Sequence, residues 1–78
     1  MKLKSYLGAN LKAWRQRYNF SLEDIALDTG LSKAFLSQIE TGASKKPSAE
    51  TAYILWKRTA IDKDWALEIF CFNPITFK

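Results

Sequence analysis

Residues 22–41 read LEDIALDTGLSKAFLSQIET and carry the clearest structural pattern in the chain. Gly30 separates two short segments, each with the pattern of a helix. The second segment, residues 32–41, carries only two charges, on Lys33 and Glu40. A helix that faces water normally carries several charges along its outer side. The outer face of this segment is therefore either buried or in contact with something other than water.

Both segments carry the end signals of consecutive helices. Ser21 is a good N-cap for the first helix, and Asp24, three residues on, comes close to a capping box. Gly30 suits a left-handed residue at the end of that helix, because it has no Cβ. Ser32 caps the second helix and Gly42 stops it. This is the pattern of a helix-turn-helix, whose apolar skeleton we assign to Ile25, Ala26, Gly30, Leu31, Leu36 and Ile39.

Apolar residues at helical spacing predict three further helices. Ser48 and Asp62 are the N-cap residues expected for the last two, and Pro74 prevents helix beyond it. The alternation of ITFK, residues 75–78, is also compatible with a short strand. We therefore predict one all-α domain over residues 1–78, with helices at about 4–17, 22–28, 33–41, 49–59 and 63–70.

Composition bounds the class of protein. A chain of 78 residues forms one domain, and its hydrophobic content of 47% provides one compact core. No apolar run approaches the roughly 20 residues that span a bilayer. Residues 1–4 are basic, but Gly8, Asn10 and Lys12 interrupt the segment after them, which argues against a signal peptide. We expect a cytoplasmic protein with no membrane partner.

The sequence argues against an enzyme and against a metal site. It contains no histidine, which removes the most common general base and the most common metal ligand. The single cysteine, Cys71, lies in an apolar segment and is interpreted as a small buried hydrophobe. A lone cysteine cannot form an internal disulfide, which fits a reducing compartment. We expect no catalytic residue, no metal and no cofactor.

The net charge of +4 is unevenly distributed. Residues 1–20 contain five basic residues and no acid, whereas residues 21–32 contain Glu23, Asp24 and Asp28 and no base. Lys45 and Lys46 form a second basic group after Gly42. A basic balance is by itself a weak indication of a polyanionic partner.

The chain resembles the phage Cro/CI-type helix-turn-helix family, also called the Xre family. The resemblance rests on LGANLKAWRQRYNFS, then LEDIALDTGLSKAFLSQIETG, then KKPSAETAYILWKRTAI, and covers roughly residues 6–61. It implies a five-helix, lambda-repressor-like DNA-binding domain, with the helix-turn-helix at about 21–41 and a dimerisation helix and tail at 62–78. The outer face of the second helix is then poor in charge because it meets a DNA groove.

The resemblance also implies residue roles. Arg15 and Glu40 match the partners of a partly buried ion pair. Gln38 is expected to bridge adenine N6 and N7, whereas Lys33 is expected to reach either guanine or only a phosphate. The positions implied for base contacts are Lys33, Ala34, Ser37 and Gln38. Those implied for phosphate contacts are Ser21, Ser44, Lys45 and Lys46, with Arg17 and Lys12 as weaker candidates.

Some positions depart from the family pattern. Leu22 stands where relatives often have a DNA-contacting glutamine, and it is either core or groove-facing. Thr59 replaces a leucine of the fourth helix, and Ser48 replaces an arginine that some relatives direct into the minor groove. Phe35, by contrast, often has an aromatic counterpart in the family, and it either packs beneath its helix or contacts a thymine methyl or sugar.

By this resemblance, the chain is expected to bind a palindromic double-stranded DNA operator as a homodimer and to regulate transcription. Expected forms are a Cro-like repressor, a restriction–modification controller or an antitoxin, of bacterial or phage origin. The alternative is a protein-interaction module that binds a partner such as a toxin. The last helix and the tail hold more large apolar side chains than five short helices can bury, and we assign these side chains to the dimer surface. The alternative is that the tail folds back on the core of its own chain. The residues are Trp65, Ile69, Phe70, Phe72, Ile75 and Phe77.

Overall fold

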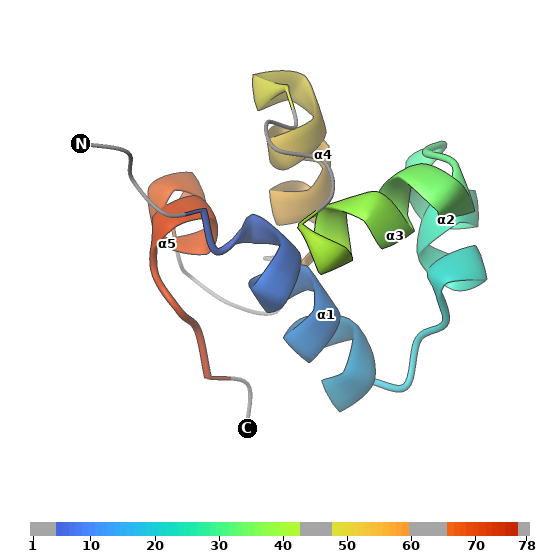
Figure 1. The fold of residues 1–78 in the computed structure, drawn as a ribbon, viewed down its shortest axis with the longest axis horizontal. Coiled ribbons are helices and arrows are strands. Elements are labelled where there is room, and N and C mark those ends of the chain that lie inside the picture. Colours follow the sequence, from blue (N-terminus) through green and yellow to red (C-terminus); the bar gives the residue numbers. More distant parts are fainter. Residues whose placement is uncertain (1–4, 43–47, 60–65, 77–78) are drawn as a thin grey trace.

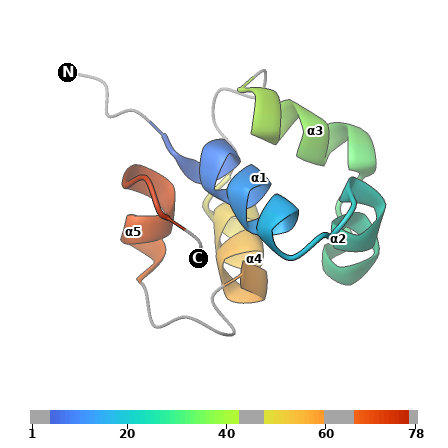
Figure 2. The same cartoon turned by 90° about the horizontal axis from the view of Figure 1, so that it is seen from below.

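The computed structural model describes residues 5–42, 48–59 and 66–76, and within them it contains helices and no strand. Two views show α1 in the middle of the molecule, with α2 and α3 towards one end and α5 at the other (Figures 1 and 2). The predicted all-α fold is confirmed. The helices are α1 (Leu7–Arg17), α2 (Leu22–Thr29), α3 (Lys33–Thr41), α4 (Ala49–Thr59) and α5 (Leu67–Phe72).

The ends of α2 and α3 are set by short-range hydrogen bonds. Ser21 Oγ accepts from the amide of Asp24 at 3.0 Å, and the Ser21 amide donates to Asp24 Oδ2 at 2.9 Å, which completes the capping box. Ser32 Oγ accepts from the Phe35 amide at 3.0 Å. Gly30 and Gly42 end the two helices at φ of 78° and 81°, a conformation that a Cβ disfavours. These four residues place the turn as the sequence predicts.

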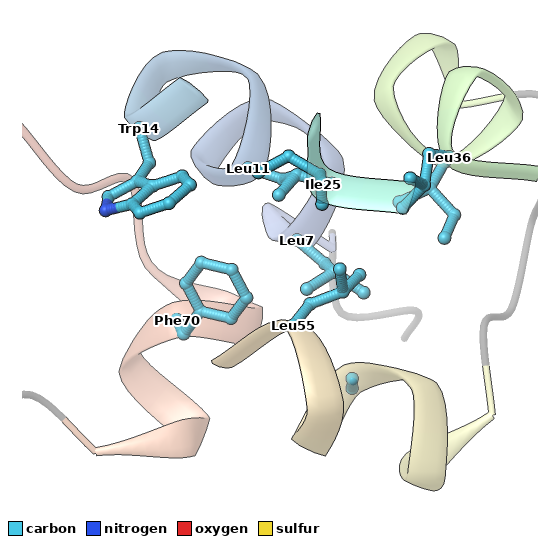
Figure 3. Close-up of a cluster of buried hydrophobic side chains, with 9 residues drawn as sticks. Leu7, Leu11, Trp14, Ile25, Leu36, Leu55 and Phe70 are labelled. Carbon is cyan, nitrogen blue, oxygen red and sulfur yellow. The ribbon is translucent and has the colours of Figure 1, made fainter. Parts of the chain in front are cut away.

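All five helices contribute to a single core. Figure 3 shows side chains from each helix pointing towards one another, among them Leu11 of α1, Ile25 of α2 and Leu55 of α4. Burying one such side chain contributes roughly 1.5–3 kcal/mol, so this cluster supplies most of the driving force for a small domain. The buried apolar residues are Leu7, Leu11, Trp14, Ile25, Leu36, Ile39, Ala52, Leu55 and Phe70.

Two contacts of α1 fix its neighbours. At Gly8, α1 crosses the end of α3 so closely that an added Cβ would lie 3.0 Å from the carbonyl carbon of Ile39 and closer still to its oxygen. On another side, the buried Asn10 side chain donates to the carbonyl oxygens of Phe70 and Asn73, at 2.6 and 2.8 Å. Its Oδ1 accepts from the Ile75 amide at 3.0 Å. Asn10 therefore ties the C-terminal segment to α1.

The predicted bounds of two helices were wrong. Helix α1 begins at Leu7 rather than near residue 4, and residues 5 and 6 are not helical. The Tyr6 amide donates to the carbonyl oxygen of Cys71 in α5, at 2.8 Å. Helix α5 runs from Leu67 to Phe72, later than the predicted 63–70, and the expected cap Asp62 lies outside the described residues. Residues 75 and 76 form no strand, because the Ile75 amide is bonded to the Asn10 side chain instead of a neighbouring backbone. Within the described ranges, no helix is long and apolar enough to cross a membrane.

Candidate nucleic-acid interface

The outer face of α3 carries the side chains that were assigned to base contacts. Lys33, Ala34 and Gln38 are exposed and Ser37 is half-buried, while Leu36 is completely buried on the opposite side. Residues at i, i+3 and i+4 share one face of a helix, so positions 34, 37 and 38 lie together. The low charge of this segment is therefore not explained by burial, because the face that lacks charge is open.

Helix α3 is held from beneath by an ion pair with α1. Arg15 Nε donates to Glu40 Oε2 at 2.9 Å, and Arg15 Nη2 donates to Glu40 Oε1 at 3.0 Å. Arg15 Nη1 also donates to the carbonyl oxygen of Phe20, at 3.1 Å. The Glu40 side chain is only 6% exposed. The hydrogen bond to Glu40 raises the pKa of the Arg15 guanidinium, against the opposing effect of burial. The family resemblance implied this pair, and the two residues form a bidentate contact that joins α3 to α1.

Lys33 has an acidic neighbour that sequence reasoning missed. Its Nζ lies 3.1 Å from Oε1 of Glu23, which is the second residue of α2. Both side chains are largely exposed. In the sequence, Glu23 stands out only as one of three acidic residues within residues 21–32, and no signal singles it out from Asp24. The turn between α2 and α3 brings Glu23 beside the first residue of α3.

The expected phosphate contacts are only partly described. Ser21 is exposed, and because its hydroxyl accepts from Asp24 through an oxygen lone pair, the hydroxyl hydrogen remains able to donate to a phosphate. Arg17 is exposed, with its guanidinium 5.9 Å from the centre of the Tyr18 ring. The residues assigned to the basic loop, Ser44, Lys45 and Lys46, lie outside the described part of the chain.

Leu22, Phe35 and Thr59 lie in or against the core, whereas Ser48 is exposed. Leu22 and Phe35 are half-buried and pack against the core cluster, which favours packing over groove contact for both. Thr59 is fully buried, and its hydroxyl donates to the carbonyl oxygens of Leu55 and Trp56 at 3.0 and 3.2 Å. The smaller polar side chain is therefore satisfied within its own helix.

A second contact, also missed from the sequence, joins α2 to α4. Arg58 Nε lies 2.6 Å from Asp28 Oδ2. The Arg58 guanidinium also lies 5.2 Å from the ring centres of Trp14 and Phe20, whose planes are stacked. Cation–π contacts of this kind hold an arginine in one place. Arg58 thus links α2 to α4, while Arg15 links α3 to α1.

The apolar residues assigned to a dimer surface divide into separate groups. The assignment of Phe70 to the dimer surface was wrong, because its side chain is completely buried in the core of its own chain. Ile75 is half-buried against that core, whereas Ile69 and Phe72 on α5 remain exposed, at 42% and 48%. Trp65 and Phe77 lie outside the described residues. The tail therefore does fold back in part, and two large apolar side chains are left on the surface.

Cys71, in the same helix, is half-buried. Burial raises the pKa of its thiol. A thiol with a raised pKa is largely protonated at neutral pH and is a poor nucleophile, which agrees with its interpretation as a small apolar residue.

Comparison with known proteins agrees with this geometry. A helix-turn-helix family model matches residues 11–65, well over half of the chain. The HTH-type transcriptional regulator SlrR of Bacillus subtilis (strain 168) is 34% identical over 44 residues, which are 56% of this chain and 29% of the relative. The chain therefore aligns with less than a third of that regulator. No solved structure matches the chain significantly. The chain belongs to the Xre-type helix-turn-helix family of DNA-binding transcriptional regulators.

Proposed function

We propose that this protein binds a palindromic DNA operator as a homodimer and regulates transcription by occupying it, as a Cro-like repressor or controller does. The observation that carries the proposal is the open, charge-poor face of α3, with Gln38 and Ser37 at its centre and Lys33 at its start. In this arrangement α3 enters the major groove, and its short polar side chains donate to and accept from base edges.

A homodimer is expected from the reach of one recognition helix, which reads only a few base pairs. Two copies related by a two-fold axis place their helices about 34 Å apart, in successive major grooves of the same side of DNA. Ile69 and Phe72 support this arrangement, because both are exposed on α5. Helix α5 lies at the end of the molecule away from α2 and α3 (Figure 1). A dimer formed there leaves both recognition faces open.

The test is selection of bound duplexes from a random library, with wild type and Gln38→Ala compared. We expect a palindromic consensus from the wild type and loss of preference at one base pair per half-site from the variant. A bidentate contact of glutamine to adenine contributes about 1–3 kcal/mol of discrimination. Gln16→Ala is the matched control, because Gln16 is exposed on α1, outside the helix-turn-helix.

Other outcomes would point elsewhere. Binding without a consensus that weakens uniformly with salt would mean that the protein only attracts phosphates. The protein-interaction hypothesis, in which the chain binds a partner such as a toxin, would then be preferred. A consensus that Gln38→Ala leaves intact would keep the DNA-binding function but would remove Gln38 from the residues that contact bases.

A further inference from the structure

Glu23 lies on the face that the proposed function turns towards DNA, although its charge opposes binding. Its side chain is 71% exposed and its carboxylate contacts Lys33, the first residue of α3. A carboxylate at this place is repelled by phosphates and cancels much of the attraction that Lys33 provides. Exposed ion pairs contribute little to folding stability, so the pair is not explained by stabilisation of the fold.

The geometry of the pair matches the edge of a base pair. Lys33 Nζ and Glu23 Oε1 place a donor and an acceptor 3.1 Å apart. On the major-groove edge of a G·C pair, guanine O6 accepts from cytosine N4 at the usual N–H···O distance of about 2.9 Å. The donor and acceptor of the ion pair are therefore spaced like those of the base pair. The ammonium donor can face guanine O6, while the carboxylate acceptor faces cytosine N4. Placed edge to edge, the ammonium donates to O6 while cytosine N4–H donates to the carboxylate.

We propose that Glu23 is a specificity-determining residue, which acts with Lys33 to read one G·C base pair in each half-site. This inference rests on the proposed DNA-binding function. Guanine N7 lies beside O6, so the Lys33 ammonium can donate to two acceptors, while the Glu23 carboxylate accepts from cytosine N4–H. An A·T pair alternates acceptor, donor and acceptor and adds the thymine methyl, so it satisfies fewer of these contacts.

The pair of Glu23 and Lys33 has opposite effects on the affinity for unrelated DNA and on the preference for one G·C base pair. Since Glu23 lowers the attraction of this face for any phosphate backbone, it weakens binding to unrelated DNA. At the correct base pair, the bond from cytosine N4 compensates for that repulsion. Removal of the carboxylate should therefore tighten binding to unrelated duplexes and weaken the preference for G·C, whereas a residue with only a structural role would not move the two in opposite directions.

The experiment compares wild type, Glu23→Ala, Lys33→Ala and the double variant. Dissociation constants are measured on the selected consensus, on consensus duplexes with each G·C pair changed to A·T, and on an unrelated duplex. We expect Glu23→Ala to reduce the G·C preference at one position per half-site about tenfold, or about 1.4 kcal/mol. The double variant should lose no more of that preference than either single variant, because the two side chains act as one unit.

Glu50→Ala is the matched control, because it removes one exposed acidic side chain from the first turn of α4, outside α2, α3 and the predicted dimer surface on α5. It should leave every base-pair preference unchanged. If Glu23→Ala changes affinity for all duplexes equally, with no change of preference, the inference is overturned and the proposed function stands. If the wild type prefers no base pair at all, the proposed function fails and this inference fails with it.

Discussion

Gly8 is the residue on which the approach of α1 to α3 depends. Alanine is preferred over glycine within a helix by about 1 kcal/mol, so Gly8→Ala would stabilise an isolated helix. Here the added Cβ collides with the backbone of Ile39, which cannot rotate away. We expect Gly8→Ala to lower the free energy of unfolding by about 1–3 kcal/mol in urea titrations. Ala9→Gly, at an exposed position of the same helix, should cost about 1 kcal/mol. Stabilisation by Gly8→Ala would contradict the close crossing.

The Arg15–Glu40 pair is a second test at the scale of single residues. Glu40→Ala leaves a largely buried guanidinium without its partner, and such losses cost about 3–5 kcal/mol in buried pairs. Because Arg15 keeps some exposure, we expect the lower end of that range, measured by chemical denaturation. The double variant Arg15→Met, Glu40→Leu should be more stable than Glu40→Ala, because no charge is left unpaired. If Glu40→Ala and the double variant lose the same free energy of unfolding, the two side chains act only through packing.

At the scale of an element, Asn10 decides where the C-terminal segment lies. Asn10→Leu keeps the size of the side chain but removes the partners of two carbonyl oxygens and of the Ile75 amide. We expect a loss of about 2 kcal/mol in the free energy of unfolding, since each buried group left unpaired costs about 1–3 kcal/mol and part of the segment can reach water. Amide exchange at Ile75 should accelerate. Asn73→Ala, which retains its own backbone carbonyl, is the control and should leave that exchange rate near the wild-type value.

The start of α2 should respond to acid. The backbone amide of Ser21 lowers the pKa of Asp24 by donating to its carboxylate, and the Ser21 side chain adds to this effect. A depressed pKa in the folded state means that the stabilisation is complete above the ordinary aspartate pKa, near 4, and is lost as pH falls through the lowered folded value. Thermal unfolding of wild type and Asp24→Asn should therefore differ at neutral pH and converge in acid. A constant difference down to about pH 2 would show that the carboxylate charge is not involved.

At the scale of the whole molecule, α5 is the surface on which a dimer is predicted to form. Ile69→Glu places a charge on this apolar surface and should convert a homodimer into a monomer, as measured by sedimentation equilibrium over a range of concentrations. Leu27→Glu is the control, because Leu27 on α2 is even more exposed, at 86%. If Leu27→Glu dissociates the dimer and Ile69→Glu does not, the interface lies on α2 instead. A wild type that stays monomeric at every concentration would remove the dimer from the proposed function.

The local sequence determined the helix-turn-helix almost completely. Ser21, Gly30, Ser32 and Gly42 carry their structural meaning within three or four residues, because caps and left-handed glycines act on adjacent backbone groups. Apolar spacing likewise identified Ile25, Leu36 and Ile39 as core. The candidate base contacts on α3 came from the family resemblance, because the residue pattern alone left the outer face of that helix either buried or in contact with something other than water.

Tertiary structure alone decided the contacts between residues far apart in the chain. Asn10 meets partners 60 or more positions away, and Arg58 meets Asp28 from 30 positions away. Glu23 reaches Lys33 only because the turn folds α3 back against the start of α2. Phe70 and Phe72 have the same apolar character in sequence, yet one fills the core and the other faces outward. Sequence pattern specifies which side of a helix is apolar, but the neighbours that cover that side are specified only when all five helices have packed.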